Sequence, residues 1–118
     1  MAIRSAAVTW VGKHKAKVAW SGLLNGDTGD GQDLSRFRDA VVQVTGTLGA
    51  GGSVSIEGSN DGGTTYHVLN DSRGEGNALT FTALDTRAMN ERPLLVRPNV
   101  TAGDGSTNFS VTVVATGD

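Results

Sequence analysis

The stretch VVQVTGTLGAGGSVSIEGS, residues 41–59, decides the fold class of this chain. Val42 and Val44 alternate with polar residues in its first half, and Val54 and Ile56 do the same in its second half. Alternation with a period of two places the apolar side chains on one face of a strand. Because the connection GAGG is a glycine turn, we expect the two halves to pair as an antiparallel hairpin.

The same alternation recurs along most of the chain, in residues 17–24, 64–69, 78–84, 93–100 and 108–116. Loops rich in Gly, Asn and Asp separate these segments. About seven or eight short strands at regular spacing predict an all-β fold, an antiparallel β-sandwich or jelly roll. The helical signal is confined to single turns at residues 33–40 and 85–91, each of which begins with an N-capping Asp.

Alternation also predicts which side chains face the core. In residues 17–24 we expect Val18, Trp20 and Leu24 to point inward. In residues 53–59 we expect Ser53, Ser55 and Glu57 to point to solvent. In residues 64–69 the pattern places Tyr66 and Val68 inside and His67 outside.

The bulk composition excludes several classes of protein. A chain of 118 residues predicts one domain, and its net charge of −2 gives no basis for binding nucleic acid. The chain has no cysteine, so disulfides and thiolate metal sites are excluded. No apolar run approaches the length of a membrane span, and the N-terminus lacks the features of a secretory signal. We therefore expect a protein that does not bind membranes and is made in the cytoplasm.

The N-terminal segment differs from the rest in charge and pattern. Residues 1–20 hold four bases and no acid, whereas the remainder has six bases against twelve acids. Apolar residues are present in the segment without a turn that would return them to the core. We predict an extended N-terminal arm, residues 1–16, on a single β-sandwich domain, residues 17–118, and we expect the arm to dock on a partner. The expected partner-binding residues are Ile3, Arg4, Val8, Trp10, Lys13, Lys15 and Lys17.

Candidate reactive groups do not converge on a recognisable site. His67 lies near Asp61 in the sequence, but no nucleophile accompanies it, so a solvated surface histidine is the simpler interpretation. The acidic loop at residues 27–33 offers oxygen ligands for calcium, yet it does not match the EF-hand spacing. Arg92 and Arg97 could form a sugar or anion site, or ion pairs with nearby acids. We therefore predict no catalytic, cofactor-binding or metal-binding residues, and no enzyme activity.

Two segments together resemble a known class of proteins. VSIEGSNDGGTTYHVL and the later LLVRPNVTAGDGSTNFSVTVVAT are similar to small β-rich structural proteins of tailed bacteriophages, most of all to capsid decoration or cement proteins. The resemblance implies a jelly roll without catalytic activity. It also implies a homo-oligomer, a dimer or trimer, on the outer capsid surface of the virion. The implied partner is the major capsid protein, whose subunits the protein would bridge.

A second resemblance leaves an alternative open. SNDGGTTYHVL and RPLLVRP look like parts of discoidin-type carbohydrate-binding jelly rolls, although Tyr66 stands where those proteins usually have tryptophan. This resemblance implies a carbohydrate-binding module of a phage tail or host-recognition structure. Tyr66 would then be the aromatic platform for the sugar.

Overall fold

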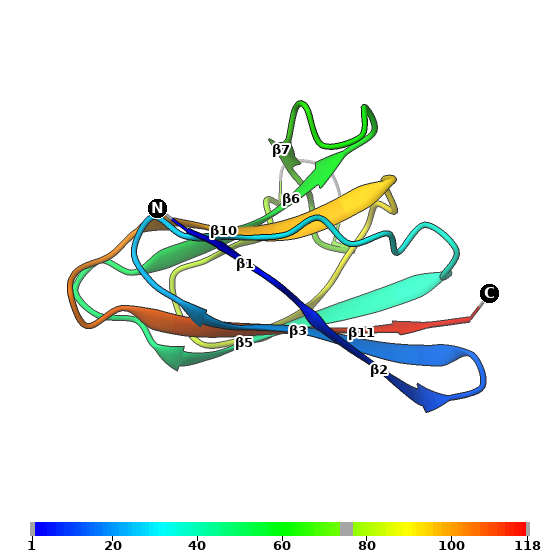
Figure 1. Cartoon of the computed structure of the whole chain (residues 1–118), viewed down its shortest axis with the longest axis horizontal. Helices are drawn as coiled ribbons and strands as arrows, with labels where there is room; N and C mark the ends of the chain where they lie inside the picture. The colour runs from blue at the N-terminus through cyan, green and yellow to red at the C-terminus, as the bar shows by residue number, and fades with distance from the viewer. Residues whose placement is uncertain (1, 74–76, 118) are drawn as a thin grey trace.

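Alternating apolar positions in the long strands build two β-sheets that face each other (Figure 1). The computed structural model describes residues 2–73 and 77–117, and within them it contains strands and no helix. The first sheet, sheet A, has the order β1 (Ile3–Arg4), β4 (Thr28–Gly29), β10 (Leu95–Ala102), β6 (Ser53–Ser59) and β7 (His67–Val68), and β8 (Thr80–Phe81) also pairs with β6. The second sheet, sheet B, has the order β2 (Ala7–Gly12), β3 (Lys15–Leu23), β11 (Asn108–Thr116), β5 (Asp39–Thr47) and β9 (Thr86–Ala88). The predicted all-β sandwich is confirmed.

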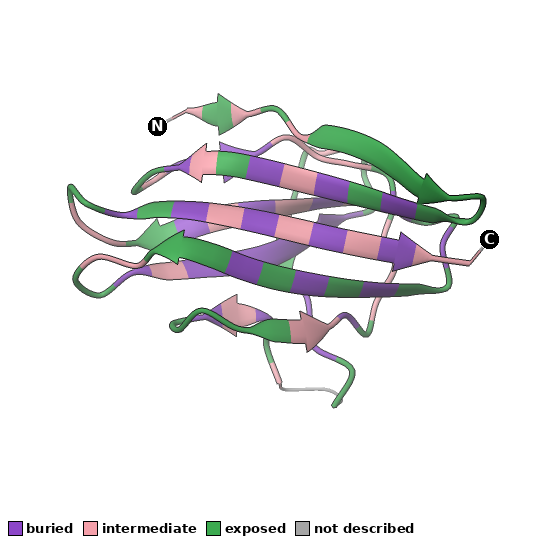
Figure 2. Ribbon diagram, turned by 90° about the horizontal axis from the view of Figure 1, so that it is seen from below, coloured by how far each residue is buried: buried purple, intermediate pink, exposed green. Residues whose placement is uncertain are grey.

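The core lies between the two sheets. Along β3, β5 and β11 buried residues alternate with more exposed ones, which produces the striped strands of Figure 2. Trp20 is fully buried, and its indole Nε1 donates to the backbone oxygen of Asp30 at 3.1 Å and to Oδ1 of the same residue at 2.9 Å. Trp20 therefore ties sheet B to the loop that follows β4 in sheet A.

The predicted hairpin between residues 41–48 and 53–59 is wrong, because its two strands lie in different sheets. β5 pairs with β11 and β9, whereas β6 pairs with β10, β7 and β8. The glycine turn carries the chain across the sandwich, with positive φ angles of 70° at Gly49 and 68° at Gly51. The loop from β10 to β11 makes the same crossing, and the Thr107 hydroxyl donates to the Leu48 carbonyl at 2.8 Å. Both strands thus find their partners in the C-terminal half of the chain.

A β-bulge changes which leucine enters the core. Leu23 is fully buried, whereas Leu24, which alternation had placed inside, is 43% exposed. The register shifts between Phe109 and Val111, and Gly22 takes a φ of 68° in the bulge. The extra residue on β3 reverses the inward and outward positions beyond it.

The prediction for the outward positions of β6 is correct in direction but wrong in their exposure to solvent. Ser55 and Glu57 point away from the core, yet both are buried. Ser55 is bonded to Thr80 at 2.9 Å across the β6–β8 pair, so neighbouring strands cover this face. Val68 pairs with Glu57 and shares its outward direction, which corrects the prediction that Val68 faces the core.

The two single helical turns that the sequence suggested are not helices. Asp33 accepts hydrogen bonds from the amide and the hydroxyl of Ser35, which makes a local turn before β5. The second segment forms strand β9 instead, because Thr86–Ala88 pairs with β5. Pairing with a neighbouring strand satisfies this backbone better than one isolated helical turn would.

The segment predicted as an arm is extended, but it is bonded to both sheets. β1 pairs in parallel with β4, and β2 pairs antiparallel with β3. The chain between them crosses from sheet A to sheet B along one side of the sandwich (Figure 1). The boundary placed after residue 16 falls inside β3.

Two aspartates hold this segment to the body. The Ala2 amide donates to Asp27 Oδ1 at 2.9 Å, and the Ala6 amide donates to Asp30 Oδ1 at 3.0 Å. Burial opposes ionisation of Asp27, but hydrogen bonds from the Leu24 and Ala2 amides and the Arg4 guanidinium outweigh it and lower the pKa of this carboxyl. These contacts explain why the segment lies against its own subunit.

Candidate functional sites

The edge strand β2 presents an apolar surface. All six of its residues are exposed (Figure 2), and its outer edge has no neighbouring strand in the part of the chain that the structure describes. Val8 pairs with Val18 and Trp10 pairs with Ala16, and both partners are buried in the core. Val8 and Trp10 therefore lie on the core-facing side of sheet B, yet they remain 51% and 50% exposed at its rim.

Trp10 is held in place by two neighbouring side chains. Its ring lies 5.9 Å from the ring of Phe37, and the Arg36 guanidinium sits 5.2 Å above its centroid. Such contacts restrict the indole, which stays 50% exposed. A fixed, half-exposed tryptophan is the kind of residue that dominates protein interfaces.

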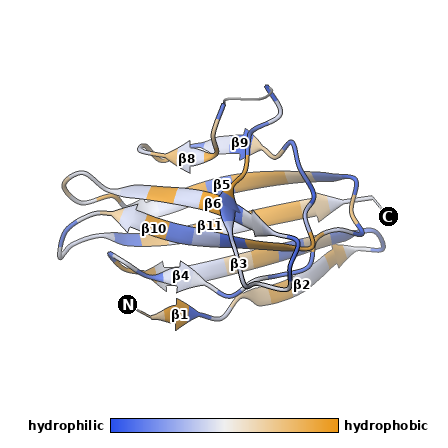
Figure 3. Cartoon of the chain, turned by 90° about the horizontal axis from the view of Figure 1, so that it is seen from above, coloured by the Kyte–Doolittle hydropathy of each residue, from blue (hydrophilic) through white to orange (hydrophobic). Residues whose placement is uncertain are grey.

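The structure gathers five of the seven predicted partner-binding residues on the β2–β3 hairpin, namely Val8, Trp10, Lys13, Lys15 and Lys17. Lys15 and Lys17 are exposed and alternate with buried residues, so they lie on the face opposite Trp10. Ile3 is 68% exposed on β1 at the edge of sheet A (Figure 3). Arg4 differs from the others, because its Nε donates to Asp27 at 3.0 Å within the subunit.

The stretch Gly58–Asp71, which contains the candidate His67, begins with a tight turn. The Asp61 carboxylate accepts from the Ser59 hydroxyl at 2.7 Å and from the Thr65 amide at 2.9 Å. The Thr65 amide and then the Ser59 hydroxyl lower the pKa of Asp61 to about 2. Positive φ angles at Gly62 and Gly63 complete the reversal.

A pocket of about 620 Å³ opens beside this turn. Its walls come from the turn, from β7 and from the segment before β10, and the lining residues are Gly58, Ser59, Asn60, Asp61, Thr65, His67, Leu69, Glu91, Arg92 and Pro93. His67 is exposed and lines the pocket, although its pairing with Gly58 places it on the opposite side of β7 from the outward-facing Val68, which corrects its predicted outward position. In the described residues no group of three or more His, Asp or Glu side chains is placed to hold a metal ion.

Arg92 and Arg97, which the sequence grouped as one candidate, have different environments. Arg97 donates to Glu57 at 3.0 Å, and its guanidinium lies 3.8 Å from the centroid of the Tyr66 ring. One face of Tyr66 is therefore occupied, and this half-buried ring is a poor platform for a sugar. Arg92 lines the pocket instead. Sequence spacing could not separate the two, because Arg97 finds its partners in distant parts of the chain, whereas Arg92 donates to nearby backbone carbonyls.

The acids of the loop at residues 27–33 point to different donors. Asp27 binds the N-terminal segment, Asp30 binds the Trp20 indole, and Asp33 binds Ser35. Their carboxylates therefore serve the loop and its neighbours, which leaves no converging set of oxygens of the kind that calcium requires. This statement concerns the residues that the structure describes.

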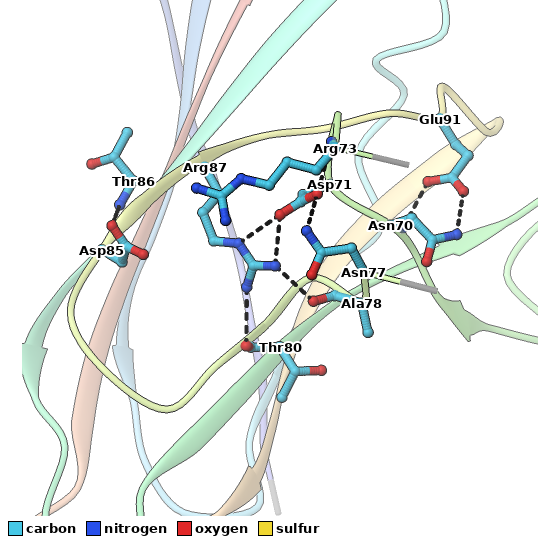
Figure 4. Close-up of polar contacts among 10 residues, drawn as sticks. All are labelled: Asn70, Asp71, Arg73, Asn77, Ala78, Thr80, Asp85, Thr86, Arg87 and Glu91. Atoms are coloured by element: carbon cyan, nitrogen blue, oxygen red, sulfur yellow. Dashed lines mark hydrogen bonds and ion pairs between the residues drawn. The ribbon is translucent and has the colours of Figure 1, made fainter. Parts of the chain in front are cut away.

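The ion pair between Arg87 and Asp71 holds together the loops around β8 and β9 (Figure 4). Arg87 donates from Nη2 to Asp71 at 2.7 Å and from Nη1 to the Thr80 carbonyl at 3.2 Å. Burial opposes ionisation of Asp71, but hydrogen bonds from Arg87, Arg73 and Asn77 outweigh it and lower its pKa. The pair fixes the chain around β8 and β9 rather than facing a cavity.

No helix in the described residues is long and apolar enough to cross a membrane. No protein-family model matches the chain, and no curated protein sequence matches it. Among solved structures, the fold is similar to that of the SPBc2 prophage-derived protein YomS, with a TM-score of 0.65 and 10% identity over 92% of this chain and 100% of that chain. It is also similar to a cupin domain from Bordetella pertussis Tohama I, with a TM-score of 0.52 and 13% identity over 100% of this chain and 99% of that one. Both likenesses concern the fold alone.

Proposed function

We propose that this chain is a non-enzymatic structural protein of a bacteriophage virion. It would bind the outer capsid surface and stabilise it by bridging major capsid protein subunits, as a dimer or trimer. The observation that carries the proposal is the exposed strand β2 with its half-exposed Trp10. The fold likeness to a prophage-derived protein supports a phage origin.

The chemistry of β2 suggests how the contact forms. An unpaired strand edge offers backbone donors and acceptors to a strand from another chain. A strand added beside β2 would extend sheet B and cover Val8 and Trp10. Covering the exposed halves of these side chains contributes on the order of 1 kcal/mol each. Repetition over many copies on a shell makes such modest contacts sufficient.

Charge supports the choice of partner. Lys13, Lys15 and Lys17 are exposed on the same hairpin, and residues 1–20 carry no acid. They would attract an acidic patch of the capsid and orient the incoming subunit. An interaction of this kind weakens as salt screens the exposed charges.

The test compares the loss of a half-exposed apolar side chain from β2 with the same kind of loss from another part of the surface. Trp10→Ala removes the exposed anchor of β2, whereas Leu84→Ala removes a side chain of similar exposure, 49%, from the loop between β8 and β9. Binding to empty shells of the encoding phage is measured by co-sedimentation over a range of concentrations. We expect Trp10→Ala to bind at least about tenfold more weakly, a loss of about 1.4 kcal/mol. Equal binding by both variants would contradict the proposed contact.

The oligomeric state is measured separately on the protein alone. Light scattering with size-exclusion chromatography should give the mass of a dimer or trimer. Imaging of shells mixed with the protein should then place density for it on the outer surface, across the seam between capsid subunits. Density confined to the tail or to the inside of the shell would overturn the proposed location.

A further inference from the structure

Three half-buried arginines of this chain bind a carboxylate in the same way. Arg4 donates from Nε to Asp27 at 3.0 Å. Arg87 donates to Asp71 from Nε at 3.0 Å and from Nη2 at 2.7 Å. Arg97 reaches Glu57 from Nε and from Nη2, both at 3.0 Å. In all three the Nε side of the guanidinium faces an acid, which is a strong geometry for an arginine–carboxylate pair.

Arg92 is the exception among these half-buried arginines. Its Nη1 donates to the backbone carbonyls of Met89 at 3.0 Å and Glu91 at 2.8 Å, while its buried Nε has no hydrogen-bond partner. Among residues 2–73 and 77–117, no acid forms an ion pair with it. Burial lowers the pKa of Arg92, and the charges of Asp39 and Glu91 only partly oppose this effect. A buried donor without a partner is unfavourable, because it has lost its hydrogen bonds to water without replacing them.

The acids of the pocket are already bound to other donors. Glu91 accepts from the backbone amide and from the side-chain amide of Asn70, each at 2.7 Å (Figure 4). Asp61 is bound within its own turn by Ser59 and Thr65. Neither carboxylate therefore forms an ion pair with Arg92 in the described residues.

The remaining pocket groups add donors and an apolar wall. Asn60 accepts the Leu94 amide at 2.9 Å through Oδ1, which directs its amide nitrogen elsewhere. Leu69 and Pro93 close around Gly58, where an added Cβ would lie 2.7 Å from Leu69 and 2.5 Å from Pro93. The pocket thus combines the Arg92 guanidinium, the Asn60 side chain and an apolar surface with the internally bonded carboxylates of Asp61 and Glu91 in about 620 Å³. That volume lies within the range of small-molecule sites, roughly 300–1,000 Å³.

We propose that this pocket binds a small carboxylate-bearing molecule, of the size of an acidic monosaccharide or an acidic amino acid, through Arg92. The carboxylate would accept from Nη2 and, after a small rotation of the side chain, from Nε on the same edge of the guanidinium. The body of the ligand would lie against Leu69 and Pro93. Arg92 would then have the kind of partner that Arg4, Arg87 and Arg97 find within the chain.

This pocket is distinct from the β2 edge. It lies beside β7 in sheet A, whereas β2 is the outermost strand of sheet B (Figure 1). Loss of ligand binding therefore leaves the capsid proposal unaffected, and loss of capsid binding leaves the pocket unaffected.

The experiment follows the Arg92 Nε–H signal of the ¹⁵N-labelled protein by NMR during titration. Glucuronate is compared with glucose, glutamate with glutamine, and inorganic phosphate tests for binding of any anion. All titrations use the same ionic strength. We expect glucuronate or glutamate to shift the Arg92 Nε–H and the Gly58 amide in a saturable way, and we expect no saturable shift from the neutral partners. The acid that binds identifies the source of the carboxylate.

Two variants complete the test. Arg92→Lys keeps the charge but loses the two-donor edge, and we expect it to bind at least tenfold more weakly. Arg38→Gln removes an exposed positive charge that does not line the pocket and should bind like the wild type. The proposal is overturned if neither acid shifts the wild-type Arg92 signal, if phosphate binds as tightly as both acids, or if Arg92→Lys binds unchanged. The wild-type titration decides the question even where a variant fails to fold.

Discussion

At the scale of the residue, Asp104 shows how one carboxylate can join two loops. Its Oδ2 accepts the Ala50 amide at 2.9 Å from the β5–β6 connection. Its Oδ1 accepts the Ser106 amide at 2.9 Å and the Ser106 hydroxyl at 2.7 Å from its own loop. The Ala50 amide first, and then Ser106, lower the pKa of Asp104 to about 2. Both loops carry the chain from one sheet to the other, so this residue ties the two crossings together.

The ionisation of Asp104 predicts a pH dependence of stability. Its folded pKa of about 2 lies below the unfolded value of 3.8, so its contribution is complete above about pH 4 and is lost as the pH falls toward 2. We expect Asp104→Asn to be less stable than the wild type at pH 7 and to lose less stability between pH 4 and pH 2. Urea unfolding at a series of pH values measures both effects.

Ser106→Ala is the matched control for that prediction. It removes one hydroxyl donor but keeps the Asp104 carboxylate and its two amide bonds. Because the lost hydroxyl also lowers the Asp104 pKa, its pH dependence should lie between those of the wild type and Asp104→Asn. If Asp104→Asn kept the full wild-type slope between pH 4 and pH 2, the stabilising role of this carboxylate would be disproved.

At the scale of the element, the sequence located the long strands but not their partners. Alternation is a local signal, so β3, β5, β6, β10 and β11 all fall within the predicted segments or extend them by a few residues. Pairing depends on contacts between distant parts of the chain. β5 lies beside β11 and not beside β6, and nothing in GAGG distinguishes a hairpin turn from a crossing between sheets.

The candidate sites also contain some features that the sequence predicts and others that it does not. The exposure of Ile3, Val8 and Trp10 could be predicted, because their segment holds more apolar residues than one edge can bury. The lack of a hydrogen-bond partner for Arg92 Nε could not be predicted from the sequence. It depends on Asn70 binding Glu91, a contact across 21 residues, and on Arg97 taking Glu57 across 40 residues.

Strand β1 offers a prediction at this scale, because Asp27 is its main anchor. Asp27 receives the Ala2 amide and the Arg4 guanidinium, so Asp27→Ala should release β1 from β4. The Thr28 and Asp30 amides, which donate to the Ala2 and Arg4 carbonyls at 3.0 and 2.8 Å, should then exchange hydrogen faster.

Hydrogen exchange followed by NMR measures that release residue by residue. Amides in the β3–β11 pair serve as the internal control and should stay protected, because their bonds do not involve Asp27. Uniformly faster exchange in both regions would mean that the variant destabilises the whole fold. In that case β1 would be no separate unit.

At the scale of the whole molecule, the N-terminal segment is part of the sandwich and also forms part of its exposed surface. β1 completes the edge of sheet A and β2 completes the edge of sheet B, so the segment spans one open side (Figure 1). Ala6, between them, packs against the core. The same segment keeps Trp10 at the rim, where a second chain can reach it. A division into a folded body and a separate arm does not describe this arrangement.

The two tryptophans differ in burial, so substitutions of the two residues should differ in their effect on stability. Trp20 is fully buried and donates to Asp30, whereas Trp10 is half exposed. Trp20→Phe replaces the buried indole by a smaller ring, removes its hydrogen bonds and should lower the free energy of unfolding by about 2–4 kcal/mol. Trp10→Phe changes a surface residue and should alter it by about 0.5 kcal/mol or less. Urea unfolding followed by circular dichroism measures both changes.

Fluorescence of the same two variants shows which tryptophan is enclosed. Trp10→Phe leaves only Trp20, so its emission should be blue-shifted and resist quenching by acrylamide. Trp20→Phe leaves only Trp10, whose emission should be red-shifted and readily quenched. A sandwich whose N-terminal segment buried Trp10 would give two similar spectra and two similar losses of stability. The difference between the variants therefore tests whether the N-terminal segment covers the core and at the same time leaves Trp10 accessible to a partner.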